Sequence, residues 1–343
     1  MRSEGQKVKR SEGGKGGSRV ILRVRLVFPI VLCLTVLVGC SRAGDVAPAA
    51  DAVASDSTRV PVFDENRAFE LLKKQVDIGP RYPNSPGHKA AAEFIQAQLK
   101  PYADGVRVQE FSLAAGGKTL KMQNILAHFN GKSDKWVLLA AHWDTRPIAD
   151  CEVAADKQKT PIPGANDGAS GVAVLLELAR MFASDKPDVG VFMVFFDGED
   201  YGPGIDDMLL GSRYFARNLK ASAAVDGKPI RIDYGILLDM VGDRNLNIHQ
   251  ERESVAAAPE VVKKVWAAAK ELGHRDKFVP TVKYQIQDDH TPLIGAGVKC
   301  IDVIDFDYGP WHTLEDTPDK CSAESLKVVG EVVAKVIYEE KGS

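Results

Sequence analysis

The sequence predicts an α/β protein in which a mixed, mainly parallel central sheet is flanked by helices on both faces, as a three-layer sandwich. Apolar, strand-like runs alternate with helix-like segments from about residue 62 to residue 338, and this alternation is typical of parallel sheets. Several of the runs are continuously apolar, as expected for strands that are covered on both faces. The first strands follow one another directly, which favours an antiparallel edge.

Helical spacing of apolar residues, together with capping and breaking residues, defines the predicted helices. Asp64 is the expected N-cap of the first helix, Gly79-Pro80 ends it, and Pro101 ends the second. The predicted helices are 65–76, 87–99, 168–182, 210–219, 258–272 and 322–338. The predicted strands are 106–113, 123–129, 136–141, 189–196, 234–241 and 299–304.

Charge is distributed unevenly along the 343 residues. The formal net charge is −3, yet the first forty residues are strongly basic. The remainder is therefore more acidic than the total suggests. Binding to nucleic-acid backbones depends on Lys and Arg that displace counterions, so we expect no nucleic-acid partner.

The N-terminal segment resembles an export signal. Arg23 and Arg25 precede an apolar run, 26–38, which is too short for a comfortable transmembrane helix. The run ends in Leu-Val-Gly-Cys, which resembles a bacterial lipobox and predicts lipidation of Cys40. We therefore expect an exported lipoprotein of a bacterial cell envelope, held on the bilayer, in the outer membrane or facing the periplasm. A cleaved signal peptide without a lipid, or an uncleaved anchor, are the alternatives.

This interpretation divides the chain into three parts. Residues 1–40 form a basic extension and signal peptide, 41–61 form a flexible tether rich in Ala, Asp and Ser, and 62–343 form one catalytic domain. Cys151, Cys300 and Cys321 are the cysteines of that domain, so it can form at most one disulfide. Their irregular spacing does not resemble a zinc ribbon.

Acidic residues and histidines follow the apolar strands. In a largely parallel sheet the ends of these strands gather around the ligand site. Taken singly, Asp167 could cap a helix, Asp239 could pair with a surface Arg, and a lone His is usually structural. Together they indicate a metal, because buried carboxylates are costly without a compensating cation. These residues are His142, Asp144, Asp167, Glu199, Asp200, Asp239 and His312.

A small set of Asp and His side chains without thiolates suits a four-coordinate catalytic zinc site. The neighbours Glu199 and Asp200 would point to opposite sides of an extended backbone. One of the two should therefore bind the metal, while the other faces the substrate as a base.

At these residues the sequence resembles the zinc-dependent aminopeptidase family that also contains the animal-type glutaminyl cyclases, over about residues 67–338. The resemblance implies a zinc-exopeptidase-like fold. It also implies that Asp167, Asp200 and His312 hold one zinc and that Glu199 is the proton shuttle. Aminopeptidases of the family reuse His142 and Asp239 for a second zinc, so His142 and Asp144 are either second-metal or orienting residues here.

Finer details resemble bacterial members of the cyclase group. In Gln287-Asp288-Asp289-His290, Asp288 stands where aminopeptidases usually carry Ser. The alternatives for Asp288 are a solvated loop acid or the N-cap of the next helix. By resemblance Trp311 walls the substrate pocket, to which we also assign Trp143 and His290. The loop 201–208 departs from the animal pattern because it contains no Trp.

The resemblance therefore implies a glutaminyl-peptide cyclotransferase, which converts N-terminal Gln of peptides or proteins to pyroglutamate and releases ammonia at a single zinc. Glu199, Asp239 and Asp288 would be its catalytic residues, with Asp239 and Asp288 in a mutual hydrogen bond. The main alternative is a two-zinc aminopeptidase in which Glu199 activates a water. A lipid-anchored binding protein with a relic metal site is the third alternative.

Overall fold

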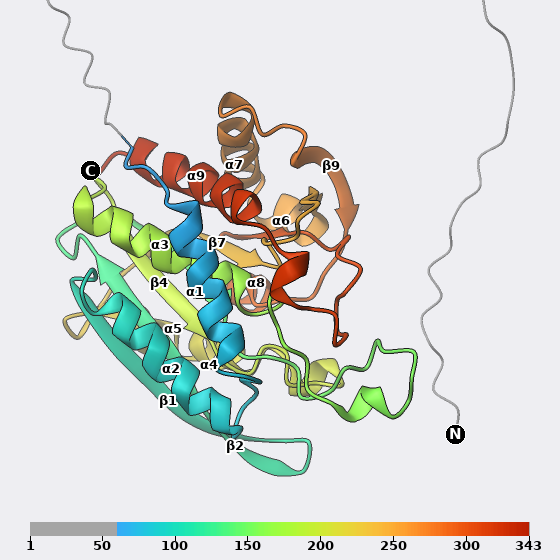
Figure 1. The fold of residues 1–343 in the computed structure, drawn as a ribbon. Coiled ribbons are helices and arrows are strands. Elements are labelled where there is room, and N and C mark those ends of the chain that lie inside the picture. Colours follow the sequence, from blue (N-terminus) through green and yellow to red (C-terminus); the bar gives the residue numbers. More distant parts are fainter. Residues whose placement is uncertain (1–59, 343) are drawn as a thin grey trace, which may run out of the picture. The chain divides into compact units, whose positions relative to one another are not determined.

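The computed structural model describes residues 60–342. Its six-stranded sheet has the order β1-β2-β4-β3-β7-β10, and Figure 1 shows its long strands running beneath the helices. The pairs β3–β4, β3–β7 and β7–β10 are parallel, whereas β1–β2 and β2–β4 are antiparallel. The strands are β1 (Gly105–Ala115), β2 (Lys118–Phe129), β3 (Trp136–His142), β4 (Gly190–Phe196), β7 (Ile232–Asp239) and β10 (Cys300–Ile304).

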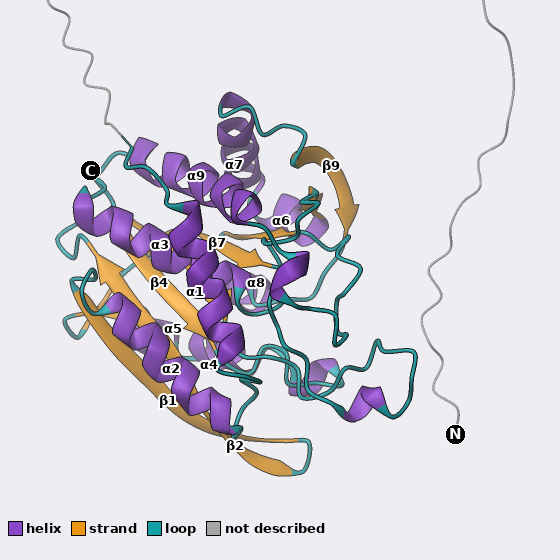
Figure 2. Cartoon of the chain, in the orientation of Figure 1, coloured by secondary structure: helices purple, strands orange, loops and turns teal. Residues whose placement is uncertain are grey.

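Helices cover both faces of this sheet. The larger apolar core lies under the first group of helices, and a second core lies between the sheet and the other group. The first group is α1 (Glu65–Asp77), α2 (Pro86–Leu99), α3 (Ser170–Ser184), α7 (Pro259–Glu271) and α9 (Ala323–Glu339); the second is α4 (Leu210–Arg217), α5 (Leu219–Ser222) and α8 (His290–Gly295). The three-layer arrangement is visible in Figures 1 and 2.

The predicted mixed sheet with an antiparallel edge is confirmed. Each predicted helix and strand is present with its ends within a few residues, except that 210–219 is divided between α4 and α5. Asp64 caps α1 as expected, because its side chain accepts a hydrogen bond from the backbone N–H of Arg67.

Several short elements of the second half were not predicted. They are the two-stranded hairpin β5 (Ala224–Val225) and β6 (Lys228–Pro229), the parallel pair β8 (Ile248–Glu251) and β9 (Phe278–Tyr284), and the short helices α6 (Arg252–Ala257) and α8. Most of β9 is exposed or half-buried. Its residues therefore lack the buried apolar pattern by which strands are recognised.

The predicted signal segment with Cys40, and nearly all of the predicted tether, lie outside the described residues. Within residues 60–342, no helix has the length and apolar character needed to cross a membrane. Cys151, Cys300 and Cys321 are free thiols, with Cys151 exposed and the other two buried.

Candidate active site

The predicted site residues gather where the parallel strands end. His142 is the last residue of β3, Asp239 is the last residue of β7, and Glu199 and Asp200 lie in the turn after β4. β3 lies between β4 and β7 and is parallel to both, so the carboxyl ends of these strands share one edge of the sheet. The acids and histidines predicted for the site are all deeply buried, and the most exposed of them, Asp239, is only 8% exposed.

Asp167, Asp200 and His312 form a cluster with the chemistry of a zinc site. One carboxylate oxygen from each Asp and one ring nitrogen of His312 lie within 4.8 Å of one another. Oδ2 of Asp200 is buried and has no hydrogen-bond partner. Two carboxylates and an imidazole are a ligand set that zinc accepts, with a fourth position left for substrate. The residues present therefore fit the metal that the sequence predicts.

Asp150 and Arg146 support two members of this cluster. Oδ1 of Asp150 lies 3.1 Å from Nδ1 of His312, which leaves Nε2 on the side of Asp200, at 3.3 Å from its Oδ1. Arg146 binds both oxygens of Asp150 and also donates from Nη1 to Oδ1 of Asp200 at 2.7 Å. Sequence reasoning missed both residues, because Arg146 and Asp150 follow the His-x-Asp strand end as ordinary loop residues.

His142 occupies the middle of a second group of carboxylates. Its Nε2 lies 3.1 Å from Oδ1 of Asp239 and 3.2 Å from Oδ1 of Asp167. On its other side Nδ1 lies 3.7 Å from Oε2 of Glu199. Burial would lower the pKa of His142, but Asp239, Asp144 and Asp167 outweigh it and raise that pKa well above its ordinary value. His142, Asp167 and Asp239 form a further group with metal-ligand geometry, in which Asp167 is shared with the first cluster.

Asp144 fixes the turn that carries Glu199 and Asp200. Its two carboxylate oxygens accept hydrogen bonds from the backbone N–H groups of Glu199 at 3.0 Å and of Asp200 at 3.2 Å. The carboxylate therefore orients the two acids through their main chain.

Glu199 and Asp200 have opposite electrostatic surroundings. Burial and the charges of Asp200 and Asp288 outweigh the effect of His142 and raise the pKa of Glu199 well above its usual value. Burial alone would also raise the pKa of Asp200, but His312 and Arg146 outweigh it and lower that pKa. Asp200 is therefore an ionised carboxylate of the metal cluster, whereas Glu199 holds a proton more strongly than an ordinary glutamate does.

Asp167 is positioned by a hydrogen bond to its backbone N–H and does not cap a helix. The N-cap of α3 is Ala169, so the alternative of Asp167 as a capping residue is wrong. The buried carboxylate of Asp316 accepts hydrogen bonds from the N–H groups of Asn166 and Asp167. Gly168 has a φ of +96°, and a Cβ there would lie 2.3 Å from the carbonyl oxygen of Asp144. This turn therefore requires glycine.

The fully buried Arg81 anchors the start of the same loop. Its guanidinium donates to the carbonyl oxygens of Trp143, Pro163 and Gly164. Sequence reasoning missed Arg81 and Asp316, because both act through contacts with main-chain groups distant in the sequence.

Of the three residues predicted for the pocket, Trp311 is the one that is partly exposed. Trp311 is half-buried and its ring stacks on His312, with centroids 3.8 Å apart. Trp143 and His290 are fully buried, and their assignment to the pocket stays a prediction. Trp143 follows His142 on an extended backbone and therefore points to the opposite face, where it packs on His88 at 4.6 Å.

Asp288 is buried, which excludes the solvated loop acid. The alternative of Asp288 as N-cap is wrong as well, because Asp289 holds that position of α8. Burial and the charge of Asp239 raise the pKa of Asp288 to about 6. The expected hydrogen bond between Asp239 and Asp288 is absent from the described residues: Oδ2 of Asp288 has no partner, and Oδ1 of Asp239 is 3.1 Å from His142.

The model of "Peptidase family M28" matches residues 124–337, which is more than half of the chain. The chain belongs to peptidase family M28. Among solved M28-like structures, a glutaminyl cyclase from Bacteroides thetaiotaomicron with N-acetylhistamine bound is 40% identical, with a TM-score of 0.78, and the match covers 82% of this chain and 100% of the other. A leucine aminopeptidase precursor from the same organism is also 40% identical, with a TM-score of 0.78 and coverage of 82% and 99%. A glutaminyl-peptide cyclotransferase of Drosophila melanogaster is 25% identical over 290 residues, covering 75% of this chain and 78% of the relative. Membership in M28 confirms the predicted relationship and the zinc-exopeptidase-like fold, while the number of zinc ions stays open.

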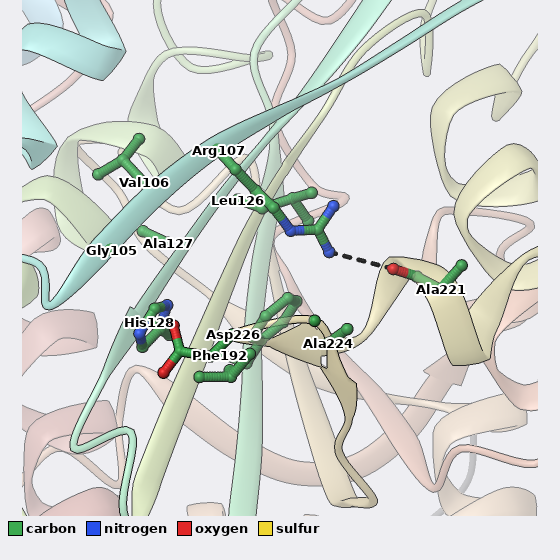
Figure 3. A pocket seen from close by; sticks show the side chains of 12 residues that line it. Gly105, Val106, Arg107, Leu126, Ala127, His128, Phe192, Ala221, Ala224 and Asp226 are labelled. Carbon is green, nitrogen blue, oxygen red and sulfur yellow. Dashed lines mark hydrogen bonds between the residues drawn. The ribbon is translucent and has the colours of Figure 1, made fainter.

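A cavity of ≈ 440 Å³ lies elsewhere in this M28 domain, between the β1–β2 edge and the β5–β6 hairpin (Figure 3). Its lining includes Arg107, His128 and Asp226, which Figure 3 shows around the opening. Phe192, near the amino end of β4, forms part of the wall, whereas Glu199 and Asp200 follow the carboxyl end of that strand. No residue of the predicted site lines this cavity.

Proposed function

We propose that this M28 protein is a glutaminyl-peptide cyclotransferase, which closes an N-terminal Gln of a peptide or protein to pyroglutamate and releases ammonia. The observation that most supports the proposal is that Glu199 and Asp200, which are adjacent in the sequence, lie in different surroundings. Asp200 is an ionised member of the Asp167–His312 cluster, while Glu199 lies outside that cluster with a raised pKa. The glutaminyl cyclases among the relatives support the same activity.

Asp167, Asp200 and His312 would hold the zinc. A zinc ion bound there supplies Lewis-acid polarisation of the γ-carbonyl of the substrate glutamine. Arg146 and Asp150 hold Asp200 and His312 in place before the metal binds. Such outer partners orient the ligands and raise metal affinity.

Glu199 would move the proton. Cyclisation requires that the α-amine lose a proton as it attacks the carbonyl carbon of the side-chain amide and that the leaving amide nitrogen gain one. A carboxyl group whose pKa is raised above its usual value can accept the first proton and donate it in the second step. Because ammonia leaves and no water attacks, one carboxyl group that shuttles a proton balances the reaction.

Asp239 and Asp288 would bind the nitrogen atoms during this transfer. His142 contacts Asp239 and keeps that carboxylate at the end of β7. Asp288 is buried and protonated over part of the neutral range, since its pKa is raised to about 6. One charged and one protonated carboxyl group can together accept from an amine and donate to a leaving nitrogen.

A second candidate function is favoured by one observation. His142, Asp167 and Asp239 also have metal-ligand geometry, and Asp167 is common to both groups. Two zinc ions held by these two groups would suit an aminopeptidase, in which Glu199 would deprotonate the water that attacks the first peptide bond. The aminopeptidase-named relative is as similar as the cyclase.

Counting the zinc ions of wild type and Asp288→Ser tests the proposal. The cyclase should hold one zinc per chain, because Asp239 is already paired with His142. Asp288→Ser should depress release of ammonia from Gln-peptides and admit a second zinc by changing the surroundings of Asp239. Two tightly bound zinc ions in the wild type would favour the aminopeptidase.

We also propose that the enzyme acts outside the cytoplasm on exported peptides or proteins, held on a bilayer through a lipid on Cys40. The lipobox-like sequence before Cys40 supports this proposal.

A further inference from the structure

The loop that carries His312 is closed by a hydrogen bond between two of its own side chains. Tyr308 precedes His312 by four positions, and Asp316 follows it by four. The hydroxyl of Tyr308 donates to Oδ1 of Asp316 at 2.7 Å. Both residues are buried, with Tyr308 at 4% exposure and Asp316 at 0%. The bond therefore joins the two ends of the segment on which one metal ligand lies.

Asp316 also holds the turn that carries a second metal ligand. Its Oδ1 accepts a hydrogen bond from the backbone N–H of Asn166 at 2.8 Å, and its Oδ2 accepts from that of Asp167 at 3.1 Å. The carbonyl oxygen of Asp316 accepts from the N–H of Ala165 at 3.2 Å. One residue thus binds three consecutive residues of the turn, and the last of them is the ligand.

These contacts connect two metal ligands through one carboxylate. His312 lies in the loop that the Tyr308 bond closes, and Asp167 lies in the turn that Asp316 holds. Nε2 of His312 is 3.8 Å from Oδ2 of Asp167. Because a metal site requires its ligand atoms at a fixed separation, any contact that positions Asp316 also affects the separation of these two ligands.

The backbone of His312 requires constraint from its surroundings. Its φ of +56° is a conformation that persists only when neighbouring contacts over-determine it. Backbone hydrogen bonds in this loop, such as that from the N–H of Asp316 to the carbonyl oxygen of Thr313, link residues three positions apart. The Tyr308–Asp316 bond links residues eight positions apart and therefore constrains the whole loop.

The turn before α3 is also tied to the chain that follows β7. Oδ1 of Asn166 accepts a hydrogen bond from the N–H of Gly242 at 2.7 Å. The hydroxyl of Ser170 donates to the carbonyl oxygen of Asn166 and accepts from the N–H of Val241. The turn is thus fixed to the end of β7, and Asp316 supplies its connection to the loop of the other ligand.

We propose that Tyr308 is a positioning residue for the zinc cluster. By holding Asp316, it sets the separation of Asp167 and His312 before the metal binds. A buried carboxylate is stable only when hydrogen bonds replace its lost water, so removal of the Tyr308 hydroxyl should allow Asp316 to shift. Both ligand segments would shift with it. The proposal rests on the proposed function in taking zinc as the metal, and it applies equally to the aminopeptidase alternative.

Tyr234 offers a matched control. Its hydroxyl also donates to a buried carboxylate, at 3.0 Å from Oε1 of Glu340, and the residue is 6% exposed. Tyr234 lies near the amino end of β7, whereas Asp239 is the last residue of that strand. Tyr308→Phe and Tyr234→Phe each remove one buried bond between a phenol and a carboxylate. The melting temperatures of both variants should therefore fall by a similar amount, roughly 1–3 °C.

Competition for zinc with a chromophoric chelator tests the proposal without an assay of activity. Tyr308→Phe should bind zinc about 3–10-fold more weakly than wild type, whereas Tyr234→Phe should stay within about twofold. Added to Asp316→Ala, Tyr308→Phe should cause no further loss of affinity, because its route to the cluster is already gone. If Asp316→Ala does not fold, the two single variants still decide.

Two results would overturn the proposal. The first is equal zinc affinity of Tyr308→Phe and Tyr234→Phe, which would show that the hydroxyl of Tyr308 contributes only to stability. The second is an undiminished effect of Tyr308→Phe in the Asp316→Ala background, which would show that Tyr308 does not act through Asp316.

Titration of activity with zinc separates this proposal from the proposed function. In Tyr308→Phe, the free zinc concentration that gives half-maximal release of ammonia from a Gln-peptide should rise by the same factor as the dissociation constant. An unchanged half-maximal concentration would contradict a role of Tyr308 in the metal site. If the wild type releases no ammonia from Gln-peptides, the proposed function fails, while the chelator comparison still decides the role of Tyr308.

Discussion

Oδ1 of Asp150 lies 3.1 Å from Nδ1 of His312, on the side of the ring away from Asp167 and Asp200. This contact assigns Nε2 to the metal side, since the other nitrogen is occupied. His312 has a φ of +56°, an uncommon value for a residue other than glycine. Asp150 and the strained backbone of His312 therefore together fix the orientation of the His312 imidazole ring.

Asp150→Ala should therefore weaken zinc binding by about 10–100-fold, the usual effect of losing an outer partner of a ligating histidine. Competition with a chromophoric chelator measures the affinity. Asp156→Ala, which removes an exposed acid from the same loop, is the control for net charge. Equal affinities of the Asp150 and Asp156 variants would show that Asp150 does not orient His312.

Glu199→Gln should keep the zinc and lose roughly two to four orders of magnitude in turnover, the scale expected for a general acid and base. Asp200→Ala and His312→Ala should instead lose the metal, because both belong to the Asp167 cluster. Metal analysis of the purified variants beside their kcat values separates the two effects. If Glu199→Gln loses zinc and Asp200→Ala retains it, the two roles are reversed.

Glu251 should stabilise the fold only while it is ionised. Its pKa is lowered from an ordinary 4.5 to about 2, so its contribution, on the order of 3 kcal/mol, is present above about pH 4.5 and is lost as pH falls toward 2. Glu251→Gln should unfold more easily at neutral pH and lose less further stability on acidification. Urea unfolding at several pH values measures this difference, with the exposed Glu93→Gln as control. If the unfolding free energies of wild type and Glu251→Gln change in parallel with pH, Glu251 does not stabilise the fold through its ionised form.

The position of most catalytic acids could be predicted from the sequence because it follows from strand periodicity. His142, Glu199 and Asp239 each come at or just after the end of a buried apolar run. Parallel strands bring such ends together whatever the details of packing.

The supporting residues could not be found in this way. Arg81, Arg146 and Asp316 act through main-chain or side-chain contacts with residues that are distant in the sequence. Their positions depend on how loops fold over the sheet, which periodicity does not describe. The burial of Trp143 and His290 could not be predicted for a related reason, because proximity to a site residue in the sequence does not determine exposure to the site.

Cys40 should carry a lipid in a bacterial host. The mature protein should begin at this residue and partition with membranes, and Cys40→Ser should release it or stall its processing. Because Ser41 rather than Asp follows the cysteine, we expect retention in the outer membrane of a two-membrane cell. Mass spectrometry of the mature N-terminus checks this, and an unmodified N-terminus elsewhere in a soluble protein would refute the anchor.

The most direct test of the cyclase assignment is mass spectrometry of one peptide with N-terminal Gln and one with N-terminal Leu, each incubated with the zinc-loaded wild type while ammonia is measured. The account predicts that the Gln-peptide loses ammonia and keeps all its residues, while the Leu-peptide is scarcely changed. Rapid release of free Leu, with no ammonia from the Gln-peptide, would contradict the cyclase and establish the aminopeptidase.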